Sequence, residues 1–119
     1  MRKAAAVTSD TILITADKKK RLIRKDDIEY IIAHGSCTRV YLIGKGIIQV
    51  RKLLKLWECI LPKEKFIKIR RSVIVNTKYI KEIERYSSRS LRIIMENSNR
   101  VLITSQRYSA KLRNRFQLV

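Results

Sequence analysis

Short runs of apolar residues recur along this chain, separated by polar or glycine-containing turns. Their β-branched content and alternation predict strands. Two turn signals, GSCT at 35–38 and GKG at 44–46, separate three of these runs and predict a meander over 28–51. The predicted strands cover 11–15, 28–34, 39–43, 47–51, 66–70, 79–85, 91–95 and 100–104. The segment 18–24 is interpreted as a basic turn followed by a short strand, and the apolar run 72–76 as a buried turn.

Two segments have helical periodicity instead. Over 51–62 the apolar residues follow the i, i+3, i+4, i+7, i+8 pattern, and Pro62 ends the helix. From Ser105 onward an apolar residue recurs every fourth position, beside a parallel row of cations, and Ser105 or Thr104 provides an N-cap. The predicted buried faces are Leu53, Leu56, Trp57, Ile60 and Leu61 in the first helix, and Tyr108, Leu112 and Phe116 in the second. Two helices are too few to cross over a parallel sheet, so the fold class is mostly β and antiparallel, with small sheets.

The stretch FIKIRRSVIVN, residues 66–76, places three cations inside an apolar run. Burying an unpaired cation costs on the order of several kcal/mol, so these three cations are not expected to lie in the core. If the strand ends at Ile69, then Ile67 and Ile69 face the core while Lys68 and Arg70 face outward. Arg70 and Arg71 then begin a loop that is held by a packed frame, which loses little entropy on binding a partner.

The length of 119 residues indicates one domain, predicted over 10–119, with 1–9 as a linker or tail. The net charge is +18, from 28 Lys and Arg against 10 Asp and Glu. Such an excess opposes compactness and indicates a polyanionic partner, first of all nucleic acid, then an anionic membrane or an acidic protein. Residues 63–81 carry seven cations and one acid, and the last fifteen residues carry four cations and no acid, together with Ser, Asn and Tyr side chains. This mixture suits phosphate and base-edge contacts on DNA.

Other function classes find no support in the sequence. His34 is the only histidine, and Cys37 and Cys59 fit no metal spacing, so we expect no metal site and no cofactor. Cys59 is interpreted as a small core residue, and the acids fit no catalytic motif, so we expect no enzyme. No apolar run exceeds four residues, so we expect neither a membrane span nor a secretory signal, and a cytoplasmic protein with reduced thiols.

The order of these blocks resembles the LytTR DNA-binding domain family. The resemblance rests on FIKIRRSVIVNTKYIKEI, on DDIEYIIAHGSCTRVYL upstream, on the helix KLLKLWECILP, and on VLITSQRYSAKL downstream, over about residues 10–116. Two positions depart from the usual pattern: many members have an acid at the position of Ile32 and a histidine at that of Arg70.

The resemblance implies an elongated, mostly β fold of several small antiparallel sheets with two short helices. It also implies sequence-specific binding of double-stranded DNA by a bacterial transcription regulator. Loops would enter successive major grooves at tandem half-sites, with a dimer on DNA as one arrangement. Since 1–9 is too short for a receiver domain, we expect either a stand-alone member or the effector part of a larger regulator, with a receiver or sensor partner elsewhere.

Carried over by position, the resemblance implies base contacts from Thr38, in the turn after the first long strand, and from Arg71 and Arg107. It also implies a set of residues that contact phosphate or support the loops: Arg39, Arg70, Ser72, Asn76, Lys78, Tyr79 and Ser105. Two alternatives stay open. One is an RNA-binding or ribosome-associated basic module, and the other is a domain that docks an acidic or membrane-bound protein.

Overall fold

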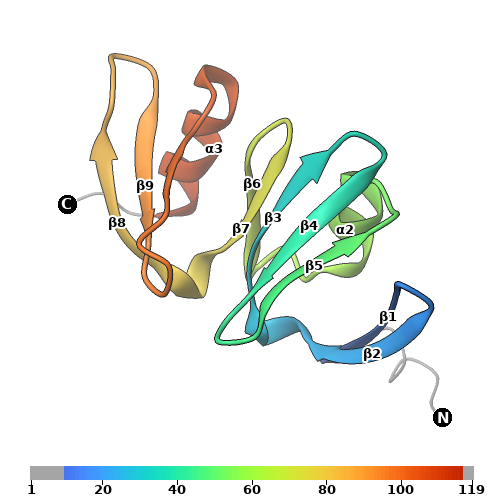
Figure 1. The fold of residues 1–119 in the computed structure, drawn as a ribbon. Helices are drawn as coiled ribbons and strands as arrows, with labels where there is room; N and C mark the ends of the chain where they lie inside the picture. Colours follow the sequence, from blue (N-terminus) through green and yellow to red (C-terminus); the bar gives the residue numbers. More distant parts are fainter. Residues whose placement is uncertain (1–9, 117–119) are drawn as a thin grey trace, which may run out of the picture.

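Ten strands form three antiparallel sheets in the computed structural model, which describes residues 10–116 (Figure 1). The central sheet has five strands in the order β5-β4-β3-β7-β6, a three-stranded sheet has the order β10-β9-β8, and β1 and β2 form a hairpin. The strands are β1 (Thr11–Ala16), β2 (Lys19–Arg24), β3 (Ile28–His34), β4 (Cys37–Leu42), β5 (Gly46–Val50), β6 (Phe66–Arg70), β7 (Val73–Asn76), β8 (Ile80–Arg85), β9 (Leu91–Met95) and β10 (Val101–Ile103). This confirms the predicted fold class, and the principal extents of 44 × 33 × 24 Å agree with an elongated shape.

The remaining elements are two α-helices and two single turns of 3₁₀-helix. These are α2 (Leu54–Ile60), α3 (Gln106–Arg115), η1 (Lys25–Asp27) and η2 (Thr77–Tyr79). Ser105 is the N-cap of α3, as one of the two predicted alternatives, and its Oγ accepts a hydrogen bond from the Tyr108 amide. The predicted tail over 1–9 and the last residues of the predicted terminal helix, 117–119, lie outside the described residues.

The two faces of the central sheet bury two separate cores. On one face Ile31, Val40 and Ile74 pack with Trp57 of α2 and with the β1–β2 hairpin. On the other face Tyr30, Ile69 and Val75 pack with Ile93 of β9 and Leu112 of α3. A strand that is buried on both faces must be apolar at consecutive positions. This explains the runs YII in β3 and VIV in β7, which do not alternate.

The segment 72–76 is a strand and not the predicted buried turn. Residues Val73–Asn76 form β7, which pairs with β3 on one side and β6 on the other. Three consecutive β-branched side chains favour an extended backbone, and a position with partners on both sides satisfies every main-chain donor and acceptor. The tight turn is two residues earlier, at Arg71 and Ser72.

The first helix is shorter than predicted and is rotated about its axis. Leu54, Trp57 and Leu61 are buried, whereas Leu53 is 61% and Leu56 40% exposed. Residues 53–61 contain so many apolar side chains that either of two adjacent faces of the helix could be the buried one. Packing against the sheet decides which face is buried. The same rotation exposes Cys59, so its assignment to the core was wrong.

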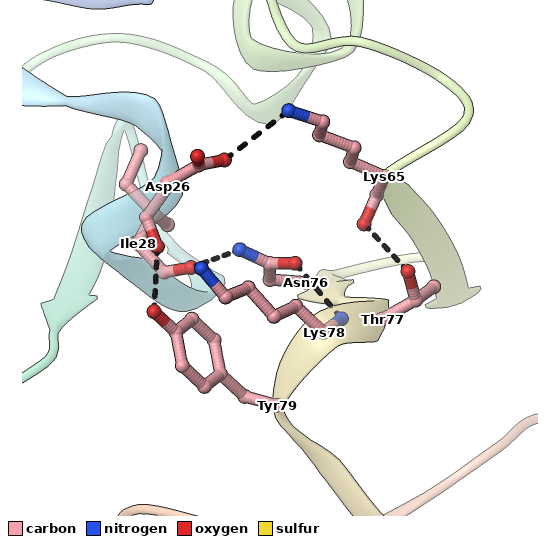
Figure 2. Close-up of polar contacts among 7 residues, drawn as sticks. All are labelled: Asp26, Ile28, Lys65, Asn76, Thr77, Lys78 and Tyr79. Atoms are coloured by element: carbon pink, nitrogen blue, oxygen red, sulfur yellow. Dashed lines mark hydrogen bonds and ion pairs between the residues drawn. The ribbon is translucent and has the colours of Figure 1, made fainter.

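Polar contacts hold the two 3₁₀-turns together at one end of the central sheet (Figure 2). Asn76 Nδ2 donates to the Ile28 carbonyl at 2.9 Å, and Asn76 Oδ1 accepts from the Lys78 amide at 3.0 Å. The Tyr79 hydroxyl donates to the Asp26 carbonyl at 2.8 Å. These bonds satisfy one buried and two part-buried main-chain groups where the chain leaves the central sheet for β8.

Candidate nucleic-acid interface

Five connecting segments converge on one edge of the molecule, opposite the 3₁₀-turns. Three of them, the β3–β4, β6–β7 and β8–β9 turns, lie along the top of Figure 1. The Ala33 amide donates to the Ser72 carbonyl at 2.8 Å, which joins the end of β3 to the β6–β7 turn. The Ser105 amide donates to the Ile69 carbonyl at 3.1 Å, which joins the start of α3 to the end of β6.

The two outer segments are tied to the same row. The Ser109 hydroxyl donates to the Arg89 carbonyl at 2.8 Å, so α3 holds the β8–β9 loop beside it. Val50 pairs with Thr38, which places the β5–α2 connection next to the start of β4. We call the combined surface the basic edge, defined as residues 34–37, 51–53, 70–72, 86–90 and 104–107.

The basic edge carries six Lys and Arg residues and no Asp or Glu. All six are exposed, and none forms a salt bridge within residues 10–116. They are Arg51, Lys52, Arg70, Arg71, Arg89 and Arg107. Unpaired cations on turns that are pinned by main-chain hydrogen bonds produce a positive surface with a fixed shape. A polyanion can therefore be bound there with little ordering cost.

The helix α3 adds a second source of positive potential. Its N-terminus lies in the basic edge, and the first amides of a helix carry a partial positive charge that favours phosphate. Arg107 is exposed in this first turn, where a cation is mildly unfavourable for the helix itself. Its position is thus better explained by an anionic partner than by helix stability.

The opposite edge has a different electrostatic character. Its connections carry Asp26, Asp27, Glu64 and Glu96 among the cations. Two of these acids form ion pairs, Asp27 with Lys45 at 3.2 Å and Asp26 with Lys65 at 3.5 Å. Neutralisation of this kind weakens the attraction for phosphate, so the two edges of the sheet differ as binding surfaces.

Five of the predicted contact residues meet at the basic edge. Arg71 lies in the β6–β7 turn and Arg107 in the first turn of α3, and both side chains are exposed. The other three are Arg70, Ser72 and Ser105. Ser72 and Ser105 are half-buried, and their main-chain groups form the hydrogen bonds that join neighbouring turns.

The prediction for Thr38 is wrong as to its position. Thr38 lies in β4 and not in the preceding turn, and it is 0% exposed. Its Oγ1 accepts a hydrogen bond from the indole Nε1 of Trp57 at 2.7 Å. The side chain points toward α2 because β4 begins at Cys37, two residues before the start at Arg39 that the turn GSCT suggested. The residues that the β3–β4 turn does present are His34, Gly35 and Ser36.

Three other predicted residues are not brought to the basic edge. Asn76, Lys78 and Tyr79 lie at the opposite end of β7, about 10 Å along the strand from Val73. Asn76 is buried, and Tyr79 bonds to the Asp26 carbonyl, so both support the junction shown in Figure 2. Arg39 takes an intermediate position, since it is half-buried on β4 and donates to Gln49 Oε1 at 3.3 Å.

The sequence interpretation did not single out Arg51, Lys52 or Arg89. The order of the strands could have indicated Arg51 and Lys52, which follow β5. In an antiparallel sheet alternate turns fall on the same edge, so the end of β5 lies on the same side as the β3–β4 turn. Arg89 is placed only by the packing of the three-stranded sheet against α3, which no local pattern reveals.

Neither a metal site nor a membrane-spanning helix has a candidate within residues 10–116. No three His, Cys, Asp or Glu side chains in this part of the chain are grouped so as to hold a metal ion. None of its helices has the length and hydropathy needed to cross a bilayer.

Both the sequence and the fold of this chain are similar to those of known proteins. The model of the family described as LytTr DNA-binding domain matches residues 18–117. A solved structure, described as the LytTr DNA-binding domain of a methyl-accepting/DNA response regulator from Bacillus cereus, superimposes with a TM-score of 0.82 at 23% sequence identity, over 92% of this chain and 99% of that one. No curated protein sequence gives a significant match.

Proposed function

Since the chain belongs to the LytTr DNA-binding domain family, we propose that it recognises duplex DNA sequence-specifically through the basic edge, as the effector domain of a transcription regulator. The observation that carries this proposal is the convergence, on turns joined by hydrogen bonds, of six cations and no acid, none of the cations forming a salt bridge within the described residues. Phosphate contacts supply most of the affinity, and side chains that reach base edges supply specificity.

The proposal assigns base contacts to Arg71 and Arg107. Both are arginines at the tips of exposed segments, and a guanidinium forms a bidentate contact with the O6 and N7 atoms of guanine. The remaining cations of the basic edge, together with the α3 N-terminus, contact phosphate. Thr38, Asn76 and Tyr79 act in this proposal as supports for the fold, and Lys78 lies outside the interface.

The dimensions of the molecule support contact with successive major grooves. The longest extent is 44 Å, whereas grooves on one face of B-DNA recur about every 34 Å. One domain is therefore long enough to meet two grooves with different turns. Tandem half-sites and a receiver or sensor partner, as the resemblance implies, complete the proposed regulator.

The distribution of aromatic residues disfavours the RNA alternative. Readers of single strands stack bases on exposed aromatic rings. All eight aromatic residues lie within the described part of the chain, and only Tyr86 among them is largely exposed, at 60%. A single ring does not make a stacking platform, so duplex DNA fits this surface better.

The test is selection of bound duplexes from a random pool, followed by affinity measurements on single-residue variants. Arg71→Ala and Arg107→Ala are each expected to cost about 1–3 kcal/mol on the selected site and to relax the sequence preference. Lys81→Ala removes another exposed cation, from β8 and outside the basic edge, and is the matched control. Equal weakening of all sequences by the two arginine variants would contradict the base-contact assignment, and a preference for single-stranded RNA would overturn the proposal as a whole.

A further inference from the structure

A cleft of about 520 Å³ lies beside β6, the edge strand of the central sheet, away from the basic edge. Its walls come from α2, from the loop between α2 and β6, and from the second half of α3. The volume is typical of sites for small organic molecules, which range from about 300 to 1,000 Å³. Arg107 lies at the start of α3, whereas the cleft is lined by Lys111, Asn114 and Arg115 further along that helix.

The floor of the cleft is apolar. It is formed by buried side chains from three elements, including the only tryptophan of the chain. These side chains are Trp57, Leu61, Phe66, Ile67 and Ile74. An apolar floor favours a ligand with a hydrocarbon or aromatic body, because covering it removes apolar surface from water.

The rim of the cleft is cationic. Four cations, Lys63, Lys68, Lys111 and Arg115, line it against the one carboxylate of Glu58. Glu58 is bound to Lys68 at 3.1 Å, and Arg115 is held by the carbonyl of Lys63 at 2.7 Å. Lys63 and Lys111 have no acidic partner in the part of the chain that the structure describes, although Lys111 Nζ lies 5.3 Å above the Tyr108 ring. These two ammonium groups are therefore available to an anion.

We propose that this cleft is a binding site for a small organic anion, namely a monocarboxylate with an apolar body. The apolar floor and the cationic rim require both parts in one molecule. A phosphodiester backbone has no apolar body to cover the floor, and a neutral apolar molecule leaves the two lysines without a partner. Because Arg70 ends β6, Arg71 follows it in the β6–β7 turn and Arg107 lies in α3, the ligand would contact the two elements that lead into the basic edge.

The single tryptophan provides a direct measurement of binding. Trp57 lines the cleft, so its fluorescence is expected to change in a saturable way when decanoate is added below its micelle concentration, at physiological salt. Acetate has the same charged group and no apolar body, and decyltrimethylammonium has the same chain length with the opposite charge. Neither is expected to produce the saturable change.

Two double variants with equal loss of charge decide whether the site is the cleft. Lys63→Gln with Lys111→Gln removes the two unpaired rim charges, and Lys20→Gln with Lys81→Gln removes two exposed cations from strands that do not line the cleft. The first is expected to weaken decanoate binding about tenfold, as the loss of charge-assisted contacts implies, and the second to leave it unchanged.

Equal weakening by both double variants, or a saturable response to decyltrimethylammonium, would overturn the proposal. Circular dichroism of both variants checks that the fold is retained, and none of these readouts depends on DNA.

Discussion

At the scale of single residues, the polar side chains divide into those that build the scaffold and those that are exposed and that we propose contact DNA. Thr38 and Asn76 are buried, and the side chain of each forms hydrogen bonds within the protein. Arg71 and Arg107 are exposed and have no ion pair within the described residues. The sequence does not distinguish these two groups, because Thr, Asn and Arg occur in DNA interfaces and in turns alike.

Replacement of Thr38 by valine tests its structural role. Thr38→Val keeps the shape of the side chain and removes the acceptor of the Trp57 indole N–H, so the free energy of unfolding should fall by about 1–3 kcal/mol. Chemical denaturation measures the loss. Thr38→Ser retains the hydroxyl and serves as the control, with a smaller loss. A valine variant as stable as the wild type would show that the hydrogen bond does not matter to stability.

A comparison of Lys78 with Arg70 tests the assignment of the two edges. Both are exposed cations, but Arg70 ends β6 on the basic edge, whereas Lys78 lies in η2 at the opposite edge. Arg70→Ala should weaken binding to duplex DNA, whereas Lys78→Ala should leave the affinity close to that of the wild type. Titration of each variant with the selected duplex at fixed salt gives the result. A larger effect at Lys78 would mean that DNA contacts the opposite edge.

At the scale of elements, the predicted strands agree closely with the observed ones except at β7, and the buried face of α2 differs from the predicted one. The predicted strand limits agree with the observed ones to within one or two residues, because alternation and β-branched residues are local signals. The exception is β7, whose consecutive apolar residues do not alternate because both faces are buried. The orientation of α2 also depended on packing, since its apolar residues allow two neighbouring buried faces.

The contact between α3 and the β8–β9 loop gives a prediction at this scale. Ser109→Ala removes a buried hydroxyl and leaves the Arg89 carbonyl, which is part-buried at this contact, without this donor. The expected cost is about 0.5–1.5 kcal/mol of stability, together with faster hydrogen exchange over 86–90. Ser36→Ala, in the exposed β3–β4 turn, is the control. Unchanged exchange in the loop would show that α3 does not hold it.

At the scale of the whole molecule, the charge is distributed unequally between two edges of one sheet. A net charge of +18 alone would attract any polyanion to any surface. Ion pairs on the edge with the 3₁₀-turns, at Asp26 and Asp27, reduce that attraction there and leave the basic edge as the stronger site.

The salt dependence of binding measures this whole-molecule property. If the six cations of the basic edge each neutralise one phosphate, log affinity should fall with log salt with a slope of about −5. Arg89→Ala should reduce the magnitude of the slope by about 1, because it removes one contact. Binding assays between low and physiological salt give the slope. A nearly flat series would contradict an interface built on phosphate contacts.

The sequence by itself determined the types of the elements with the exception of β7, the antiparallel class, the excess of positive charge and, through the order of its blocks, the family. These properties follow from local backbone preferences and from composition, which do not depend on how the elements are arranged in three dimensions. The tertiary structure decided which turns share an edge, that Thr38 faces α2, and that Arg51, Lys52 and Arg89 join Arg71 and Arg107. The reason is physical: strand direction and register place residues that are distant in the chain on one surface, and one step of register turns a side chain from solvent to core.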